Sequence, residues 1–112
     1  MIFVEQFQPE ILEDLDETDE YILDSLKDNF MLWYEDLEEA GVEDVFVAFD
    51  GGTVIGFQTV DRDGYCCAIE VLEEYQGQGI GKLLVKESGC FKPDRNECPE
   101  FWAKMEEEFG DN

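Results

Sequence analysis

Short stretches of the chain alternate apolar and polar residues, or are continuously apolar, as strands are. Residues 2–7 alternate and stop before Pro9, which predicts an edge strand. Residues 45–49 and 53–60 are apolar runs joined by Asp50-Gly51-Gly52, a sequence that favours a tight hairpin turn. A further run, 65–71, follows the turn residues 61–64. The pattern predicts a mixed, mainly antiparallel sheet.

Elsewhere apolar residues recur three and four positions apart, the spacing of an amphipathic helix. One helix is predicted from Thr18, a good N-cap, to the stop signal Gly41. Its apolar stripe consists of Leu23, Leu26, Phe30, Trp33, Tyr34 and Leu37. A short acidic helix is predicted over 10–15, and further helices over 79–88 and 99–109. These elements predict an α/β (α+β) fold in which helices flank the sheet.

The end of the long predicted helix is strongly acidic. Its last turn carries Glu35, Asp36, Glu38 and Glu39. Carboxylates at a helix C-terminus oppose the helix dipole by roughly 0.3 kcal/mol or more each. Two interpretations stay open: a solvated face, or charges that serve something other than helix stability.

A chain of 112 residues suits a single domain over 1–112, and a 44% share of hydrophobic residues is enough to build a core. No apolar run approaches the roughly 18 to 20 residues of a membrane span, and the start lacks the basic region of a signal peptide. We therefore expect a cytoplasmic protein that does not engage a membrane. Without histidine or a C-x-x-C motif, no metal site is predicted.

The charge of the chain is unusually negative. Thirty acidic residues face seven basic ones, for a net charge of −23 at pH 7. The excess is greatest in residues 1–50, which hold 17 acids and Lys27 as the only base. Such a charge repels phosphate backbones and excludes direct nucleic-acid binding. It favours a basic partner or a basic substrate.

The segment 76–81, Gln-Gly-Gln-Gly-Ile-Gly, joins the last predicted strand to the helix over 79–88. Glycines let the backbone approach a ligand closely, and a helix N-terminus offers N–H groups to an anion. The dinucleotide fingerprint and the Walker pattern both fail here, because the residues around Gly81 and Lys82 do not match them. The segment therefore predicts an anion site of another kind.

The stretch 71–84 resembles motif A of the GNAT acetyltransferase superfamily, whose form Q/R-x-x-G-x-G/A is met by Gln76, Gly79 and Gly81. The order of elements over 1–89 also resembles the family, and the short length resembles its bacteriophage-encoded forms. The resemblance implies acetyl-CoA as the cofactor, its pyrophosphate bound by backbone amides of the loop. The implied cofactor-binding residues are Val71, Gln76, Gly77, Gln78, Gly79, Ile80, Gly81 and Lys82. For Lys82, an ordinary surface position remains equally open.

Two family features are missing. Residues 88–93 leave almost no room for the fifth strand that normally helps to hold the pantetheine. The later helix has Phe101-Trp102 where the family often carries a tyrosine that protonates the leaving thiolate. We expect a sheet truncated after the motif A helix.

Amine acetylation needs a polarised carbonyl and a proton acceptor. The resemblance places a backbone N–H near Val71 at the carbonyl, and Glu70 is the best-placed general base on the same strand. The simpler interpretation, that Glu70 is only a solvent-facing strand residue, is favoured over the catalytic one.

Two functions remain as hypotheses. The first is an acyl-CoA-dependent N-acetyltransferase acting on a basic amine or basic protein. The second is a catalytically degenerate phage protein whose carboxylates mimic DNA and inhibit a host nucleic-acid-binding protein in restriction, repair or defence. An exposed sheet edge also favours a possible homodimer.

Overall fold

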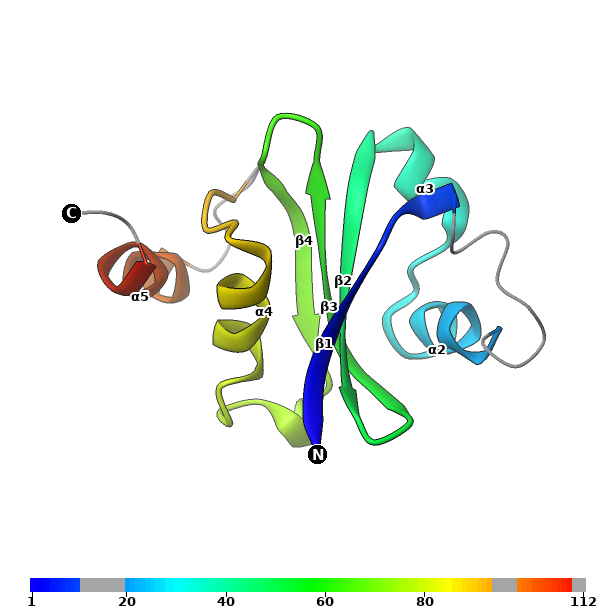
Figure 1. Ribbon diagram of the computed structural model, residues 1–112, viewed down its shortest axis with the longest axis horizontal. Coiled ribbons are helices and arrows are strands. Elements are labelled where there is room, and N and C mark those ends of the chain that lie inside the picture. Colours follow the sequence, from blue (N-terminus) through cyan, green and yellow to red (C-terminus); the bar gives the residue numbers. More distant parts are fainter. Residues whose placement is uncertain (11–19, 94–98, 110–112) are drawn as a thin grey trace.

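The computed structural model describes residues 1–10, 20–93 and 99–109, and it places one antiparallel sheet between two layers of helices (Figure 1). The strands are β1 (Ile2–Phe7), β2 (Val42–Asp50), β3 (Thr53–Asp61) and β4 (Cys66–Val71). They lie in sequence order, so β1 and β4 form the two edges. The predicted α+β fold and mainly antiparallel sheet are confirmed.

Turn residues set both hairpin connections. Gly51 and Gly52 alone join β2 to β3, as the Asp-Gly-Gly sequence predicts. After β3, the Asp61 carboxylate accepts hydrogen bonds from the backbone N–H groups of Asp63 and Tyr65, both at 2.9 Å. An aspartate that bonds to its own turn in this way fixes the loop. Both predicted turns are confirmed.

The single helix predicted over 18–41 is wrong. Its described part forms two helices, α2 (Tyr21–Phe30) and α3 (Tyr34–Glu39). α2 ends because Met31 takes a left-handed φ of 57°, and the Met31 N–H donates to the Lys27 carbonyl at 2.9 Å. Glycine usually occupies this position, and methionine gives no stop signal. The break could therefore not be seen in the sequence, where the apolar spacing continues through it.

The break moves part of the predicted stripe out of the core. Leu26 and Leu37 are buried as predicted, but Trp33 is 52% exposed. Its ring lies beneath the Lys27 ammonium, 5.2 Å from the ring centroid, a cation–π contact. Thr18, together with the predicted helix over 10–15 beyond Glu10, lies outside the described residues.

The break also relocates two of the acids assigned to a C-terminal turn. Glu35 and Asp36 lie in the first turn of α3, where the helix dipole favours a carboxylate. Asp36 accepts a hydrogen bond from the Trp33 N–H at 3.1 Å. The prediction that these two acids oppose their helix is therefore wrong.

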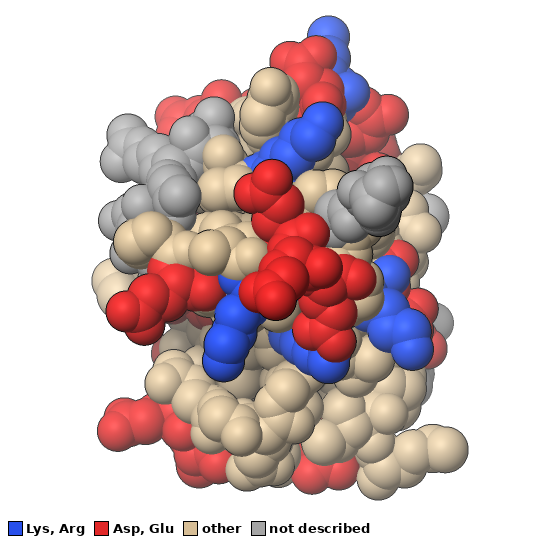
Figure 2. Space-filling view, turned by 90° about the vertical axis from the view of Figure 1, so that its left-hand side faces the viewer, with Lys and Arg blue, Asp and Glu red and all other residues tan. Residues whose placement is uncertain are grey.

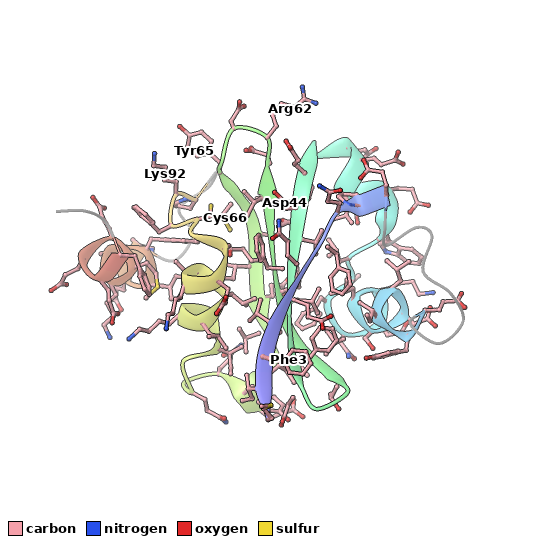
Figure 3. All side chains as sticks on the ribbon, viewed as in Figure 1. Phe3, Asp44, Arg62, Tyr65, Cys66 and Lys92 are labelled. Carbon is pink, nitrogen blue, oxygen red and sulfur yellow. The ribbon has the colours of Figure 1, made fainter. Side chains whose placement is uncertain are left out.

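The alternation of β2 and β3 divides the core between the two faces of the sheet. The face covered by α2 and α3 buries Ile22, Leu26, Leu37, Val45, Val47, Phe49, Val54 and Phe57. The other face is covered by α4 (Ile80–Ser88) and α5 (Pro99–Phe109), and its core includes Phe46, Ala48, Ile55, Cys66, Leu84, Trp102 and Met105. In Figure 3, Cys66 points from β4 toward the α4 side. No described helix is long and apolar enough to span a membrane.

β4 is an edge because the chain after α4 hardly extends the sheet. Within the described residues, one parallel bridge joins Cys66 to Pro93, and the Cys66 N–H donates to the Lys92 carbonyl at 2.7 Å. The next described element is α5, which packs beside α4. The described chain adds no fifth strand, as expected, so the later part of β4 keeps an open outer edge.

Candidate active site

The connection between β4 and α4 ends in a helix N-terminus without a side-chain cap. It begins with a 3-10 turn, η1 (Glu73–Tyr75), after which Gly77 and Gly79 take φ values of 82° and 83° that other residues rarely adopt. Gly79 is the N-cap residue of α4, and no side chain bonds to the helix there. The first N–H groups of α4 are therefore open to an anion, which the helix dipole also favours.

Two glutamines brace this loop from within. Gln76 donates from Nε2 to the Val71 carbonyl at 3.0 Å, and Gln78 donates from Nε2 to the Glu74 carbonyl at 3.1 Å. Gln76 thereby fixes the loop to the end of β4. Gln78 shapes the loop with its side chain turned back on η1.

The backbone of Val71 faces the open edge of β4. The next residue, Leu72, donates its N–H to the Ile55 carbonyl on the β3 side at 2.9 Å. Successive residues of a strand direct their N–H groups to opposite sides, so the Val71 N–H points outward. The hydrogen bond from Gln76 reaches the Val71 carbonyl on this same edge. The predicted donor at Val71 is thus directed away from the sheet, with no described strand beyond it.

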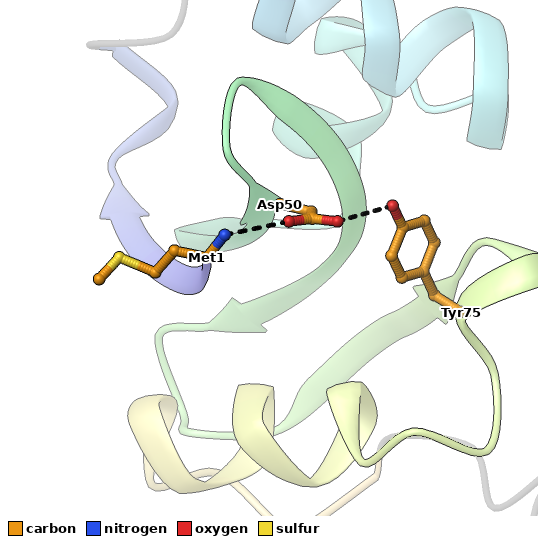
Figure 4. Close-up of polar contacts among 3 residues, drawn as sticks. All are labelled: Met1, Asp50 and Tyr75. Atoms are coloured by element: carbon orange, nitrogen blue, oxygen red, sulfur yellow. Dashed lines mark hydrogen bonds and ion pairs between the residues drawn. The ribbon is translucent and has the colours of Figure 1, made fainter.

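Tyr75 ties the loop to the β2–β3 hairpin (Figure 4). Its hydroxyl donates to Asp50 Oδ2 at 2.9 Å, and the Met1 ammonium lies 3.3 Å from Asp50 Oδ1. The hydrogen bond from Tyr75, followed by that from the N-terminus, lowers the pKa of the Asp50 carboxyl. The same bond to Asp50 raises the pKa of the Tyr75 hydroxyl. Tyr75 is therefore held as a donor that positions the loop.

A cleft of about 1040 Å³ opens between the loop, the outer edge of β4 and α5. Eight of the nine predicted site residues line it: Glu70, Val71, Gln76, Gly77, Gly79, Ile80, Gly81 and Lys82. The ninth, Gln78, does not. The opposite wall comes from α5 through Phe101, Trp102, Lys104, Met105, Glu107 and Glu108. The predicted residues therefore meet on one wall of the cleft, and the opposite wall, from α5, was not predicted from the sequence.

Glu70 lines the cleft, but its side chain leaves the sheet on a different face from that of Val71. It is paired with Phe57 across β3 and β4, so its side chain leaves the sheet on the α2–α3 face, opposite to its neighbour Val71. It nevertheless lines the cleft, because β4 is the edge strand. Partial burial raises the pKa of the Glu70 carboxyl, which makes the carboxylate a better proton acceptor. Its role as a base remains a prediction.

Basic residues gather on the side of the molecule that carries the cleft. Figure 2 views this side and shows lysine and arginine side chains around a central group of acids. Lys82 of α4 forms an ion pair with Glu108 of α5, and Lys104 lines the same cleft. Lys27 is the only base in the described part of residues 1–50. The cleft thus combines the cations Lys82 and Lys104 with three carboxylates, Glu107 and Glu108 of α5 and Glu70 of β4.

The polar residues of α5 were missed in the sequence, although a signal was present. From the sequence, only Phe101 and Trp102 were singled out in this helix. Lys104 and Glu108 follow Phe101 by three and seven positions, which places all three on one helix face. A charged pair on the face of the partly buried Phe101, beside the buried Trp102 and Met105, indicates a helix that borders a polar site.

A family model described as "Acetyltransferase (GNAT) domain" matches residues 41–108. No curated protein matches the chain. The family match spans the β2–β4 sheet, the glycine loop and nearly all of α5.

Solved structures agree with this match. A GNAT family acetyltransferase from Streptococcus pneumoniae TIGR4 is 26% identical, with a TM-score of 0.62 over 94% of this chain and 86% of the other. An aminoglycoside acetyltransferase from an uncultured soil metagenomic sample is 16% identical, with a TM-score of 0.56 over 98% and 88%. A ribosomal-protein-alanine N-acetyltransferase from Brucella melitensis biovar Abortus 2308 is 16% identical, with a TM-score of 0.53 over 100% and 92%. The last two likenesses concern the fold alone.

Proposed function

Because the chain belongs to the GNAT acetyltransferase family, we propose that it is an acyl-CoA-dependent N-acetyltransferase whose acceptor is a basic amine or a basic protein. One observation carries the proposal: the uncapped N-terminus of α4 and the outward N–H of Val71 border the same cleft. An anion-binding end and a donor beside it are what an acyl-CoA requires of a backbone.

The residues around the cleft fit acetyl-CoA. Its phosphates would lie against the open N–H groups that follow Gly79, where Lys82 adds a positive charge. When bound, it supplies the activated acetyl group. Ile69, Val71 and Trp102 give part of the cleft an apolar lining. The Val71 N–H donates a hydrogen bond toward the strand edge, where negative charge develops on an oxygen during acyl transfer.

Glu70 supplies the proton acceptor in this proposal. A cationic amine must lose a proton before it attacks, and the carboxylate next to Val71 is placed to accept it. Because the side chain of Glu70 leaves the sheet on the α2–α3 face, the amine approaches from that face. The tyrosine that often protonates the leaving thiolate in the family has no counterpart on α5. The CoA thiolate therefore takes its proton from solvent.

The charge of the α2–α3 side supports a cationic acceptor. The two helices carry six acids, Asp24, Asp28, Glu35, Asp36, Glu38 and Glu39, and only Lys27 as a base. A surface of one sign raises the local concentration of oppositely charged substrates and speeds their encounter. The acetyl donor, which is an anion, enters from the opposite side, where α4 and α5 carry three lysines beside five acids and are therefore less acidic.

Calorimetric titration with acetyl-CoA tests the cofactor site. Gly79 and Gly89 cap the two ends of α4, both with positive φ and with open space where a Cβ would lie. Gly79→Ala and Gly89→Ala therefore strain the backbone alike. We expect Gly79→Ala to weaken acetyl-CoA binding about tenfold or more, and Gly89→Ala to leave it within about twofold, because only Gly79 shapes the anion end. Absence of binding to the wild type at millimolar acetyl-CoA would refute the proposal.

Release of CoA in the presence of a polyamine, an aminoglycoside or a basic peptide tests the base. Glu70→Gln should lower kcat/KM by about 10²-fold or more and remove the acidic limb of its pH profile. Acetyl-CoA affinity should stay unchanged. Glu5→Gln, an exposed strand carboxylate on β1, is the matched control. Equal activity of the two variants would show that Glu70 is only a solvent-facing residue.

A second function, inhibition of a host nucleic-acid-binding protein by DNA mimicry, is favoured by the acid-rich α2–α3 side. It would suit a phage-encoded protein acting in the host cytoplasm. Salt-sensitive capture of a purified DNA-binding enzyme, without acetyl-CoA binding, would favour it. Within the described residues β1 and β4 are the outer strands of the sheet, and such strands favour a homodimer, which a measurement of mass in solution would test.

A further inference from the structure

The ion pair between Lys82 and Glu108 joins two helices that both line the cleft, rather than lying within one element. Lys82 is in the first turn of α4, beside the N–H groups that an anion would use. Glu108 is near the end of α5, and both residues line the cleft. Their side chains are 49% and 45% exposed, so the pair is reachable by solvent and by ligands. A carboxylate thus holds the lysine nearest to the proposed phosphate site.

α5 is placed close to the loop by apolar packing. A Cβ on Gly81 would lie 3.1 Å from the Phe101 ring, so the absence of a side chain at Gly81 lets the ring approach the first turn of α4. Trp102 and Met105 are buried in the core on this face. The helix therefore cannot carry Glu108 away without loss of that packing. Any ligand phosphate must act on the ion pair itself.

We propose that Glu108 is a specificity-determining residue. Its carboxylate pairs with Lys82 where a cofactor phosphate would otherwise bind, and this competition sets the affinity of the cleft for phosphate-bearing ligands. This inference rests on the proposed function. A ligand phosphate displaces the Glu108 carboxylate from Lys82 and is also repelled by Glu107 and Glu108. Lys104, which lines the same wall, has no ion-pair partner within the described residues. It offers the arriving phosphate a second cation.

Calorimetric titration of Glu108→Gln with acetyl-CoA tests the inference. The dissociation constant should fall about two- to five-fold, the range expected for loss of an exposed competing ion pair. Glu106→Gln is the matched control: it removes the same charge from α5 at a residue that does not line the cleft, and its affinity should change less than about twofold. The melting temperature of Glu108→Gln should not rise, which separates tighter binding from general stabilisation.

The Lys82→Ala background makes the test specific. If Glu108 acts through Lys82, Glu108→Gln should gain much less in that background than in the wild type. Equal affinity of the Glu108→Gln and Glu106→Gln variants, or an undiminished gain without Lys82, would overturn the inference.

Inorganic pyrophosphate serves as a second probe because it needs neither thioester nor catalysis. If the wild type binds pyrophosphate but not acetyl-CoA, the proposed function fails. The pyrophosphate affinities of Glu108→Gln and Glu106→Gln then still test the inference. If acetyl-CoA binds and Glu108→Gln changes the affinity for neither ligand, the inference fails while the proposed function stands.

Discussion

Met31 shows how one residue divides a helix against its own preference. It takes a left-handed φ of 57° with its side chain 79% exposed, so the strained backbone is not offset by much side-chain packing. The hydrogen bond from its N–H to the Lys27 carbonyl closes the end of α2. Such a position suits glycine, and the sequence places methionine there.

Met31→Gly should therefore raise the free energy of unfolding by about 0.5 to 1 kcal/mol, measured by urea denaturation. Ala40→Gly is the control, because Ala40 ends α3 with a right-handed φ of −81°. That change should lower the free energy, since glycine only adds freedom to the unfolded chain there. The explanation fails if both substitutions shift stability in the same direction.

The buried thiol of Cys66 makes the stability of the fold depend on pH. Burial raises the pKa of its thiol to about 12, whereas an unfolded cysteine ionises near pH 8.5. Above about pH 8.5 the folded state binds more protons at this residue than the unfolded state does. The contribution of the neutral thiol to stability is therefore full below that pH and is lost as the pH rises toward about 12.

Cys66→Ala should cost about 1 to 2 kcal/mol at neutral pH through lost packing, and the cost should shrink by about 1 kcal/mol or more by about pH 10. Denaturant unfolding at several pH values measures it. Val60→Ala, a buried neighbour in the same core, should cost the same at every pH. A parallel pH dependence of the two variants would contradict the assignment.

At the scale of elements, the pairing of β3 with β4 holds the site in place. Gly56 lies opposite Val71, and a Cβ at Gly56 would come within 2.9 Å of the Glu70 carbonyl oxygen. That oxygen belongs to the backbone and cannot turn away. The close approach of the two strands at the residues that line the cleft therefore depends on a missing side chain.

Gly56→Ala should lower the free energy of unfolding by about 1 to 3 kcal/mol and weaken acetyl-CoA binding, because β4 must move at Glu70 and Val71. Thermal melts and calorimetry measure the two effects. Gly52→Ala, in the turn before the same strand, has open space for its Cβ and should be nearly neutral. Equal melting temperatures for the two variants would rule out the steric argument.

At the scale of the whole molecule, the net charge of −23 acts against a compact structure with a radius of gyration of 13.4 Å. At low ionic strength the screening length exceeds this radius, so acids repel one another across the whole molecule. Raising NaCl from about 10 mM to about 0.5 M shortens the screening length to a few ångströms. We expect the melting temperature to rise by several degrees. An unchanged or falling melting temperature would show that the charges are already compensated.

The sequence predicted the elements whose signals are local. The strands, the two hairpin turns, the glycine loop and α4 follow from alternation and from turn residues such as Gly51. The break at Met31 did not, since the apolar spacing continues through it and methionine carries no stop signal. The relocation of Asp36 to the start of a helix followed from that one missed boundary.

The glycine loop, in which Gly77 and Gly79 take positive φ, was thus determined by the sequence, because glycine adopts that conformation far more readily than other residues. The wall that completes the cleft was decided only by tertiary structure. α5 reaches the loop through packing of Phe101 on Gly81 and through the ion pair of Glu108 with Lys82. These contacts join residues about 20 or more positions apart, and their geometry depends on how two helices pack on one sheet face, which no local pattern specifies.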